Sequence, residues 1–134
     1  MYCSETKIRV RYGETDRMGY LYYGNYAEYF EVGRTEMLRS LGLTYKSMED
    51  EGIILPVRSI SINFRSPAHY DDLLTIKTCL RSFPEVKLDF SYEILSEDGL
   101  LHCSGNTILV FVDAATKKIR KAPGYFQEAM RKYF

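Results

Sequence analysis

The chain has 134 residues, of which 46% are hydrophobic and 27% are charged, and its 18 Lys and Arg residues balance 18 Asp and Glu residues. This composition is typical of a globular protein, and the length predicts a single domain over residues 1–134. A formal net charge of zero argues against nonspecific nucleic-acid binding, which depends on an excess of cations. No apolar run approaches the ~18 residues of a membrane span.

The three cysteines, Cys3, Cys79 and Cys103, are an odd number without CxxC spacing. They favour reduced thiols over a disulfide framework. The N-terminal segment has no apolar stretch typical of a signal peptide, so we expect a cytoplasmic protein. The spacing of His, Cys and Asp residues matches no metal signature, so we expect neither a metal nor a cofactor.

Apolar and charged residues alternate over residues 6–12, which predicts a half-buried strand. Residues 13–24 follow no period and include three glycines. A helix should come next, since an apolar stripe repeats at helical spacing through Tyr26, Tyr29, Phe30, Gly33, Met37 and Leu41. Asn25 is the expected N-cap and Gly42 the expected stop, whereas Arg34 lies toward the predicted polar side.

A short helix over 44–51 precedes a change to period two. We expect four more strands, over 60–65, 74–81, 86–94 and 100–112, linked by hairpins, and a terminal helix over 122–133. Gly33 on the buried stripe predicts a close helix–sheet approach, and Gly105 predicts a bulge or a close approach. The fold class is therefore α+β, with a long helix along the concave face of a curled, mostly antiparallel five-stranded sheet.

Chemistry is expected in the aperiodic segment 13–24, because core packing does not set its residues. Asp16 lies there, shortly before a helix N-terminus with unpaired N–H groups. A carboxylate facing such donors can attack a carbonyl or activate water for acyl transfer. The alternative is that Asp16 only forms an Asx-turn or a cap. His69 and His102 have no nearby nucleophile and predict no triad.

The segment Arg11–Tyr26, with its Asp-x-x-Gly loop leading through Tyr-x-Asn-Tyr into the helix, resembles the active-site segment of the 4-hydroxybenzoyl-CoA thioesterase family. Residues 29–38 resemble the central helix of that family, and residues 62–72 resemble its second strand and the following turn. The resemblance spans essentially the whole chain. It implies a hotdog fold and hydrolysis of a fatty or aromatic acyl-CoA to free acid and CoA.

The resemblance also implies roles for single residues. Asp16 would act as the nucleophile or as a general base, and these two roles stay open. The main-chain N–H of Tyr23 would bind the oxyanion, and Asn25 would support it as the helix cap. Tyr20, Tyr22, Arg58 and Arg65 are candidates for the substrate pocket or for CoA, and the cations of 117–121 could meet its phosphates.

The same resemblance implies a site between two subunits whose sheets join edge to edge, so we expect a homodimer or a tetramer. The substrate implied by the resemblance would be acyl-CoA or an acyl-carrier protein. One branch of the family usually has His where this chain has Tyr23, so a His-assisted mechanism is not expected. Two alternatives are a non-catalytic acyl or acyl-carrier-binding hotdog protein and a dehydratase, which would require a catalytic His near the helix start.

Overall fold

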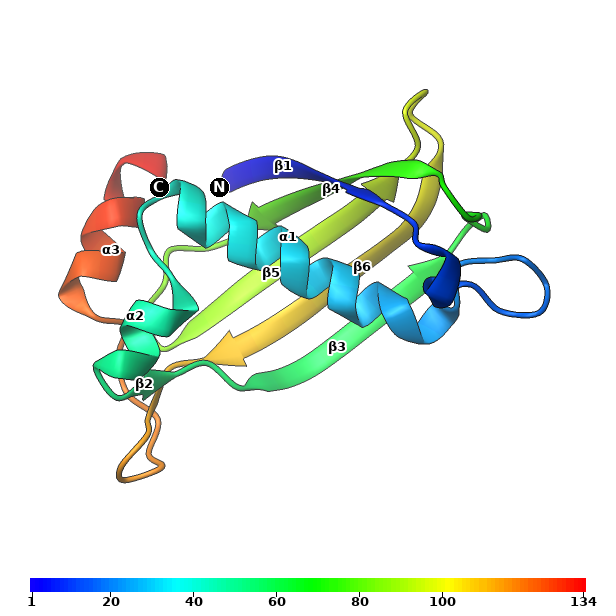
Figure 1. Cartoon of the computed structure of the whole chain (residues 1–134). Coiled ribbons are helices and arrows are strands. Elements are labelled where there is room, and N and C mark those ends of the chain that lie inside the picture. Colours follow the sequence, from blue (N-terminus) through cyan, green and yellow to red (C-terminus); the bar gives the residue numbers. More distant parts are fainter.

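The computed structural model describes all 134 residues (Figure 1). One five-stranded sheet has the order β1-β4-β5-β6-β3, and all neighbouring strands are antiparallel. Its strands are β1 (Tyr2–Arg9), β3 (Val57–Phe64), β4 (Leu73–Leu80), β5 (Lys87–Leu95) and β6 (Leu101–Val110). A second, two-residue pair joins β2 (Ile53–Ile54) to β7 (Val112–Asp113).

Three α-helices accompany the sheet: α1 (Tyr26–Ser40), α2 (Tyr45–Asp50) and α3 (Gly124–Met130). Figure 1 shows α1 crossing one face of the curved sheet, while α2 and α3 lie at the end remote from loop 13–24. Short 3₁₀ turns occur at Tyr12–Glu14, Tyr23–Asn25 and Arg131–Tyr133. The predicted α+β arrangement is confirmed. No helix is both long and apolar enough to cross a membrane.

The strand connections differ from the expectation that hairpins link all four later strands. After β3 the chain crosses to the other half of the sheet, where β4 pairs with β1 and β5. Strand β3 instead pairs with β6, which lies between β5 and β3 in the sheet. The first strand also ends at Arg9, three residues before its predicted end, because the chain turns into a 3₁₀ helix at Tyr12.

Two glycines let α1 lie close to the sheet, as their positions predicted. A Cβ at Gly33 would approach Ile76 Cγ2 to 2.8 Å and would also collide with Thr78 Oγ1. A Cβ at Gly105 would overlap the Phe30 ring. That ring stacks on Tyr92 with its centroid 4.3 Å away, so the glycines fix the height at which α1 sits above the sheet.

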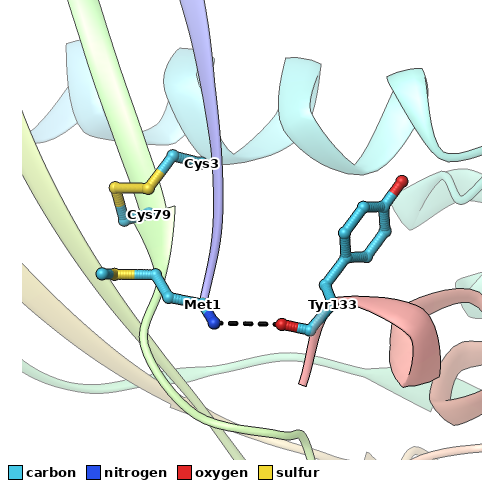
Figure 2. Close-up of a disulfide and its surroundings, with 4 residues drawn as sticks. All are labelled: Met1, Cys3, Cys79 and Tyr133. Carbon is cyan, nitrogen blue, oxygen red and sulfur yellow. Dashed lines mark hydrogen bonds between the residues drawn. A yellow bond between two sulfur atoms is a disulfide. The ribbon is translucent and has the colours of Figure 1, made fainter.

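The expectation of three reduced cysteines is wrong for two of them. Cys3 and Cys79 face each other across β1 and β4, with Cα atoms 4.0 Å apart, and form a disulfide (Figure 2). The pairing depends on the β1–β4 neighbourhood, which joins residues 76 apart in sequence. Cys103 is free and buried, and burial raises the pKa of its thiol to about 12.

Strand β3 is an open edge of the sheet. It pairs only with β6, and seven of its eight residues are exposed. Its exposed residues include large apolar side chains, with Val57 46%, Ile60 47% and Phe64 53% exposed. A strand edge with unpaired backbone groups and exposed apolar side chains is a typical surface for pairing with another strand.

Candidate active site

The loop before α1 is held against the turn that follows β3. Leu21 N–H donates to the Ala68 carbonyl at 2.7 Å, and Tyr20 forms an isolated β-bridge with His69. A pocket of about 270 Å³ lies between them. Most of its lining is apolar, and it consists of Asp16, Met18, Tyr20, Leu21, Tyr23, Tyr26, Phe64, Arg65, Ser66 and Pro67.

Asp16 uses its two carboxylate oxygens differently. Its Oδ1 accepts hydrogen bonds from Met18 N–H at 2.9 Å and from Tyr20 N–H at 3.2 Å. Its Oδ2 has no hydrogen-bond partner within the chain. The Asx-turn interpretation is therefore correct for one oxygen, and it leaves the other oxygen available. The two backbone hydrogen bonds fix the side chain of Asp16, which lines the pocket.

Tyr23 begins the 3₁₀ turn that leads into α1, and it lines the same pocket as Asp16. The first N–H groups of a helical turn have no acceptor within it. The macrodipole of the following 15-residue helix adds partial positive charge at this end. Asp16, with its fixed carboxylate, and Tyr23, at the start of a helical turn, therefore line the same mostly apolar pocket.

Asn25 occupies the predicted N-cap position of α1 but does not cap the helix with its side chain. Its backbone is already helical, with φ −84° and ψ −13°, because the 3₁₀ turn precedes it. Its Nδ2 instead donates to the Glu14 carbonyl at 2.9 Å. Asn25 thus ties the helix start to the loop that bears Asp16, which is a different form of support from the expected cap.

Glu14 is a second carboxylate of the loop, which no sequence pattern singled out. The turn at Tyr12–Glu14 directs it into the core, where it is 7% exposed. Its Oε1 accepts from Arg11 N–H at 2.9 Å and from Tyr29 O–H at 2.8 Å, and its Oε2 accepts from Arg11 Nη2 at 3.2 Å. Both oxygens are occupied, so Glu14 holds the loop and Asp16 has the free oxygen.

Two pKa shifts reflect this cluster. Burial would raise the pKa of Glu14, but the hydrogen bonds from Arg11 and Tyr29 outweigh it and lower the pKa below 4.5. Burial, followed by the hydrogen bond to Glu14, strongly raises the pKa of Tyr29. Glu14 is therefore charged and Tyr29 neutral at neutral pH, which is the pairing that their hydrogen bond requires.

The other candidates divide into two groups. Tyr20 and Arg65 line the pocket. Tyr22 lies beside it, with its ring 4.6 Å from that of Tyr23, but is not part of the lining. Arg58 is at the opposite end of β3, about 23 Å from Arg65 at the ordinary rise per residue of a strand. The cations of 117–121 follow β7, at the end of the sheet remote from Asp16 (Figure 1).

No group of three His, Cys, Asp or Glu side chains is arranged to hold a metal ion. His102 is buried on β6 and meets Ser66, with 3.3 Å between its Nδ1 and the Ser66 Oγ. His69 packs edge-on against Tyr20.

Comparisons with known proteins identify the family of the chain. A model of the thioesterase-like superfamily matches residues 10–130. The chain is 35% identical over 118 residues to YneP of Bacillus subtilis (strain 168), covering 88% of this chain and 86% of that protein. It is 31% identical over 116 residues to the acyl-CoA thioester hydrolase YbgC of Escherichia coli O6:H1, covering 87% of each.

Solved structures give the same result. A DHNA-CoA thioesterase from Staphylococcus aureus superimposes with a TM-score of 0.94 at 35% identity, covering 99% of this chain and 91% of that one. A protein from Thermus thermophilus, TT1821, superimposes with a TM-score of 0.91 at 30% identity, covering 98% and 99%.

Proposed function

The chain belongs to the thioesterase-like superfamily, and from that premise we propose that Asp16 carries its hydrolytic reaction in the pocket before α1. The protein has the hotdog fold and hydrolyses acyl-CoA thioesters. The observation that carries the proposal is that Asp16 lines the pocket with Oδ1 fixed by two backbone N–H groups, while Oδ2 has no hydrogen-bond partner within the chain.

Two forms of the reaction fit this geometry. In one, Asp16 Oδ2 attacks the thioester carbonyl carbon, CoA leaves as a thiolate, and water then hydrolyses the mixed anhydride. In the other, Oδ2 takes a proton from water as that water attacks the same carbon. In both, negative charge develops on the carbonyl oxygen. The N–H of Tyr23 is the donor for that oxygen, and such a donor is worth ~10²–10³ in rate.

The pocket lining supports an apolar acyl group, either fatty or aromatic. Tyr20, Tyr26 and Phe64 present rings to it, and the Tyr26 and Phe64 rings meet edge to face at 5.2 Å. Arg65 is the cation at the pocket and is our candidate for contact with CoA or with an acyl-carrier protein. Arg58 can take that role only from a partner subunit, since it lies at the other end of β3.

A homodimer is part of the proposal. The open β3 edge, with Val57, Ile60 and Phe64 exposed, would pair with the same edge of a second copy to make one continuous sheet. Phe64 also lines the pocket, so the second copy would close its open side. A dimer provides this second copy, and so does a tetramer built from two such dimers. We also propose a cytoplasmic location; because the cytosol keeps thiols reduced, Cys3 and Cys79 would be in the dithiol form there and would form the disulfide only under oxidising conditions.

The test is thioester hydrolysis followed with a thiol reagent, using acyl-CoA esters of graded chain length and aryl-CoA esters. The same acyl groups on an acyl-carrier protein discriminate between the two carriers. We expect CoA release from the wild type and none above background from the Asp16→Asn variant. Binding of acyl-CoA without release of CoA would contradict the proposal and would favour a non-catalytic protein.

A further inference from the structure

His102 is a buried histidine that the proposed mechanism does not use. It lies near the start of β6 and is only 4% exposed. The fold brings Ser66, 36 residues away in the chain, next to it, with 3.3 Å between the serine Oγ and the His102 Nδ1. Ser66 also lines the pocket at Asp16. A serine and a histidine therefore meet at the pocket, and the geometry of their contact decides what the pair can do.

The hydrogen bonds of Ser66 fix the direction of the proton between the two side chains. Its Oγ–H donates to the Leu101 carbonyl at 3.0 Å, so the hydroxyl proton does not point at the imidazole. Its own carbonyl oxygen lies 3.2 Å from the same Nδ1 and can only accept. Nδ1 is therefore the protonated nitrogen, and its N–H is shared between the carbonyl and the Oγ of Ser66. A general base needs a free lone pair at the serine proton, so His102 does not activate Ser66.

The contact attaches the turn after β3 to the start of β6. The His102 carbonyl accepts Arg65 N–H at 2.9 Å and Ser66 N–H at 3.2 Å. Together with the side-chain hydrogen bonds, these hold the chain just beyond Phe64, which faces Cys103 in the last register pair of β3 with β6. Arg65 and Ser66 both line the pocket, so this attachment sets the position of one pocket wall.

The same turn holds the loop that bears Asp16, which lies at this end of the sheet (Figure 1). Two residues after Ser66, the Ala68 carbonyl accepts Leu21 N–H at 2.7 Å. The neighbouring Tyr20 N–H donates to Asp16 Oδ1 at 3.2 Å, and Asp16 N–H donates to the Tyr20 carbonyl at 2.9 Å. A shift of the turn therefore moves Leu21 and Tyr20, and the carboxylate moves with them.

We propose that His102 is a positioning residue for thioester hydrolysis: by donating its Nδ1–H to Ser66, it holds the turn that carries both a wall of the pocket and the loop of Asp16. The proposal rests on the proposed function of Asp16. A displacement of about 1 Å at the reacting groups can cost ~10² in rate, so a contact outside the pocket can set kcat.

The first experiment compares substitutions at His102 that keep or remove this donor. In His102→Asn an amide N–H takes the place of Nδ1–H, in His102→Gln the amide lies one bond further out, and His102→Leu has no donor. We expect Leu and Gln to lower kcat by about tenfold or more, with a smaller change in KM, and Asn to retain kcat within about threefold. Equal kcat in all three, or no advantage of Asn over Gln in folded protein, overturns the proposal.

Thr107→Val is the matched control for stability. Thr107 lies on the same strand, and the loss of its hydrogen bond with Tyr92 should destabilise the fold without changing the turn at Ser66. This variant should have the kcat of the wild type at a temperature where both are folded. A comparable fall in kcat for Thr107→Val and His102→Leu would mean that kcat follows stability, and it would overturn the positioning role.

A measurement on the wild type needs no substitution and serves if the variants do not fold. The ¹⁵N chemical shifts of the neutral His102 imidazole, measured by NMR at mildly alkaline pH, identify which nitrogen carries the proton. We expect the proton on Nδ1 and a free lone pair on Nε2. The opposite tautomer, with the lone pair of Nδ1 turned toward Ser66, overturns the proposal.

Two further variants separate this proposal from the proposed function. Ser66→Ala keeps the carbonyl that accepts from His102, so it should lower kcat by no more than about tenfold, whereas loss of a serine nucleophile costs on the order of 10⁶. A loss of that size would make Ser66 the nucleophile and would overturn the positioning role. Normal turnover in Asp16→Asn contradicts the proposed function itself. An inactive Asp16→Asn beside an unchanged kcat in His102→Leu contradicts only the positioning role.

Discussion

The phenol of Tyr29 donates to the carboxylate of Glu14 at 2.8 Å, and this contact joins the first turns of α1 to the loop that carries Asp16. Arg11 donates to the same carboxylate through its backbone N–H and its guanidinium. The position of Asp16 relative to the start of α1 therefore depends on a neighbouring acid that does no chemistry itself. That dependence gives the first prediction.

Glu14→Gln should destabilise the protein at neutral pH and have a smaller effect in acid. The pKa of Glu14 is lower in the folded state than its ordinary 4.5. Its contribution to the free energy of unfolding is therefore fully present above pH 4.5 and is lost as the pH falls through the lowered pKa. Thermal unfolding of both proteins at neutral pH and in acid measures this. An equal difference in Tm at both pH values would contradict it.

Gly33→Ala should cost ~1–3 kcal/mol, because the added Cβ collides with Ile76 and Thr78 and this outweighs the better helix propensity of Ala. Gly33→Leu should cost more. Gly124→Ala is the control, since nothing lies within 4 Å of the Cβ that it adds. Chemical denaturation gives the three values. An unchanged free energy of unfolding in Gly33→Ala would mean that α1 does not press on β4 there.

Thr78→Val should stabilise the protein by ~1 kcal/mol. The hydroxyl of Thr78 is buried without a hydrogen-bond partner, so its removal relieves an uncompensated desolvation cost. Thr107→Val is the matched comparison, because the Thr107 hydroxyl meets Tyr92 O–H at 2.6 Å and its loss should destabilise by a similar amount. The same sign for both substitutions in denaturant titrations would refute this account of β4 and β6.

Reduction of the Cys3–Cys79 bond should lower the melting temperature. A cross-link over 76 residues restricts the unfolded chain, and in the loop-entropy model this raises the free energy of unfolding by roughly 4 kcal/mol. Cys3→Ser should melt like the reduced wild type and should not respond to reductant. Cys103 is the internal reference, because its buried thiol should react only after unfolding. Three reactive thiols in unfolded, unreduced protein would show that the bond does not form.

Much of the scaffold follows from local patterns. The apolar stripe from Tyr26 to Leu41 predicts α1, since only a helix brings those positions to one face, and Gly33 on that stripe predicts the close approach to β4. Residues around Asp16 follow neither strand nor helix spacing, and this indicates the loop that lines the pocket. The resemblance to thioesterases then implies that Asp16 is the catalytic carboxylate in this loop. The comparisons confirm the family.

The remaining features depend on contacts between distant residues, which local patterns do not encode. Cys3 meets Cys79 only because β4 crosses the sheet to pair with β1. Glu14 lies in the segment that follows no period, and its place in the core depends on the hydrogen bond from Tyr29, 15 residues further along the chain. Arg34 appears polar and exposed by helical phase, but α2 folds over it and Tyr45 takes its Nε–H.

The most direct test of the central claim is kcat for Asp16→Asn with an acyl-CoA that the wild type hydrolyses. Asn retains an Oδ1 that can accept from Met18 and Tyr20 N–H, so the loop and the melting temperature should change little. Loss of the free carboxylate oxygen should lower kcat by at least ~10²–10⁴-fold. Glu14→Gln should retain measurable turnover. Near-normal kcat in Asp16→Asn, or abolished turnover in a folded Glu14→Gln alone, would contradict the assignment of Asp16.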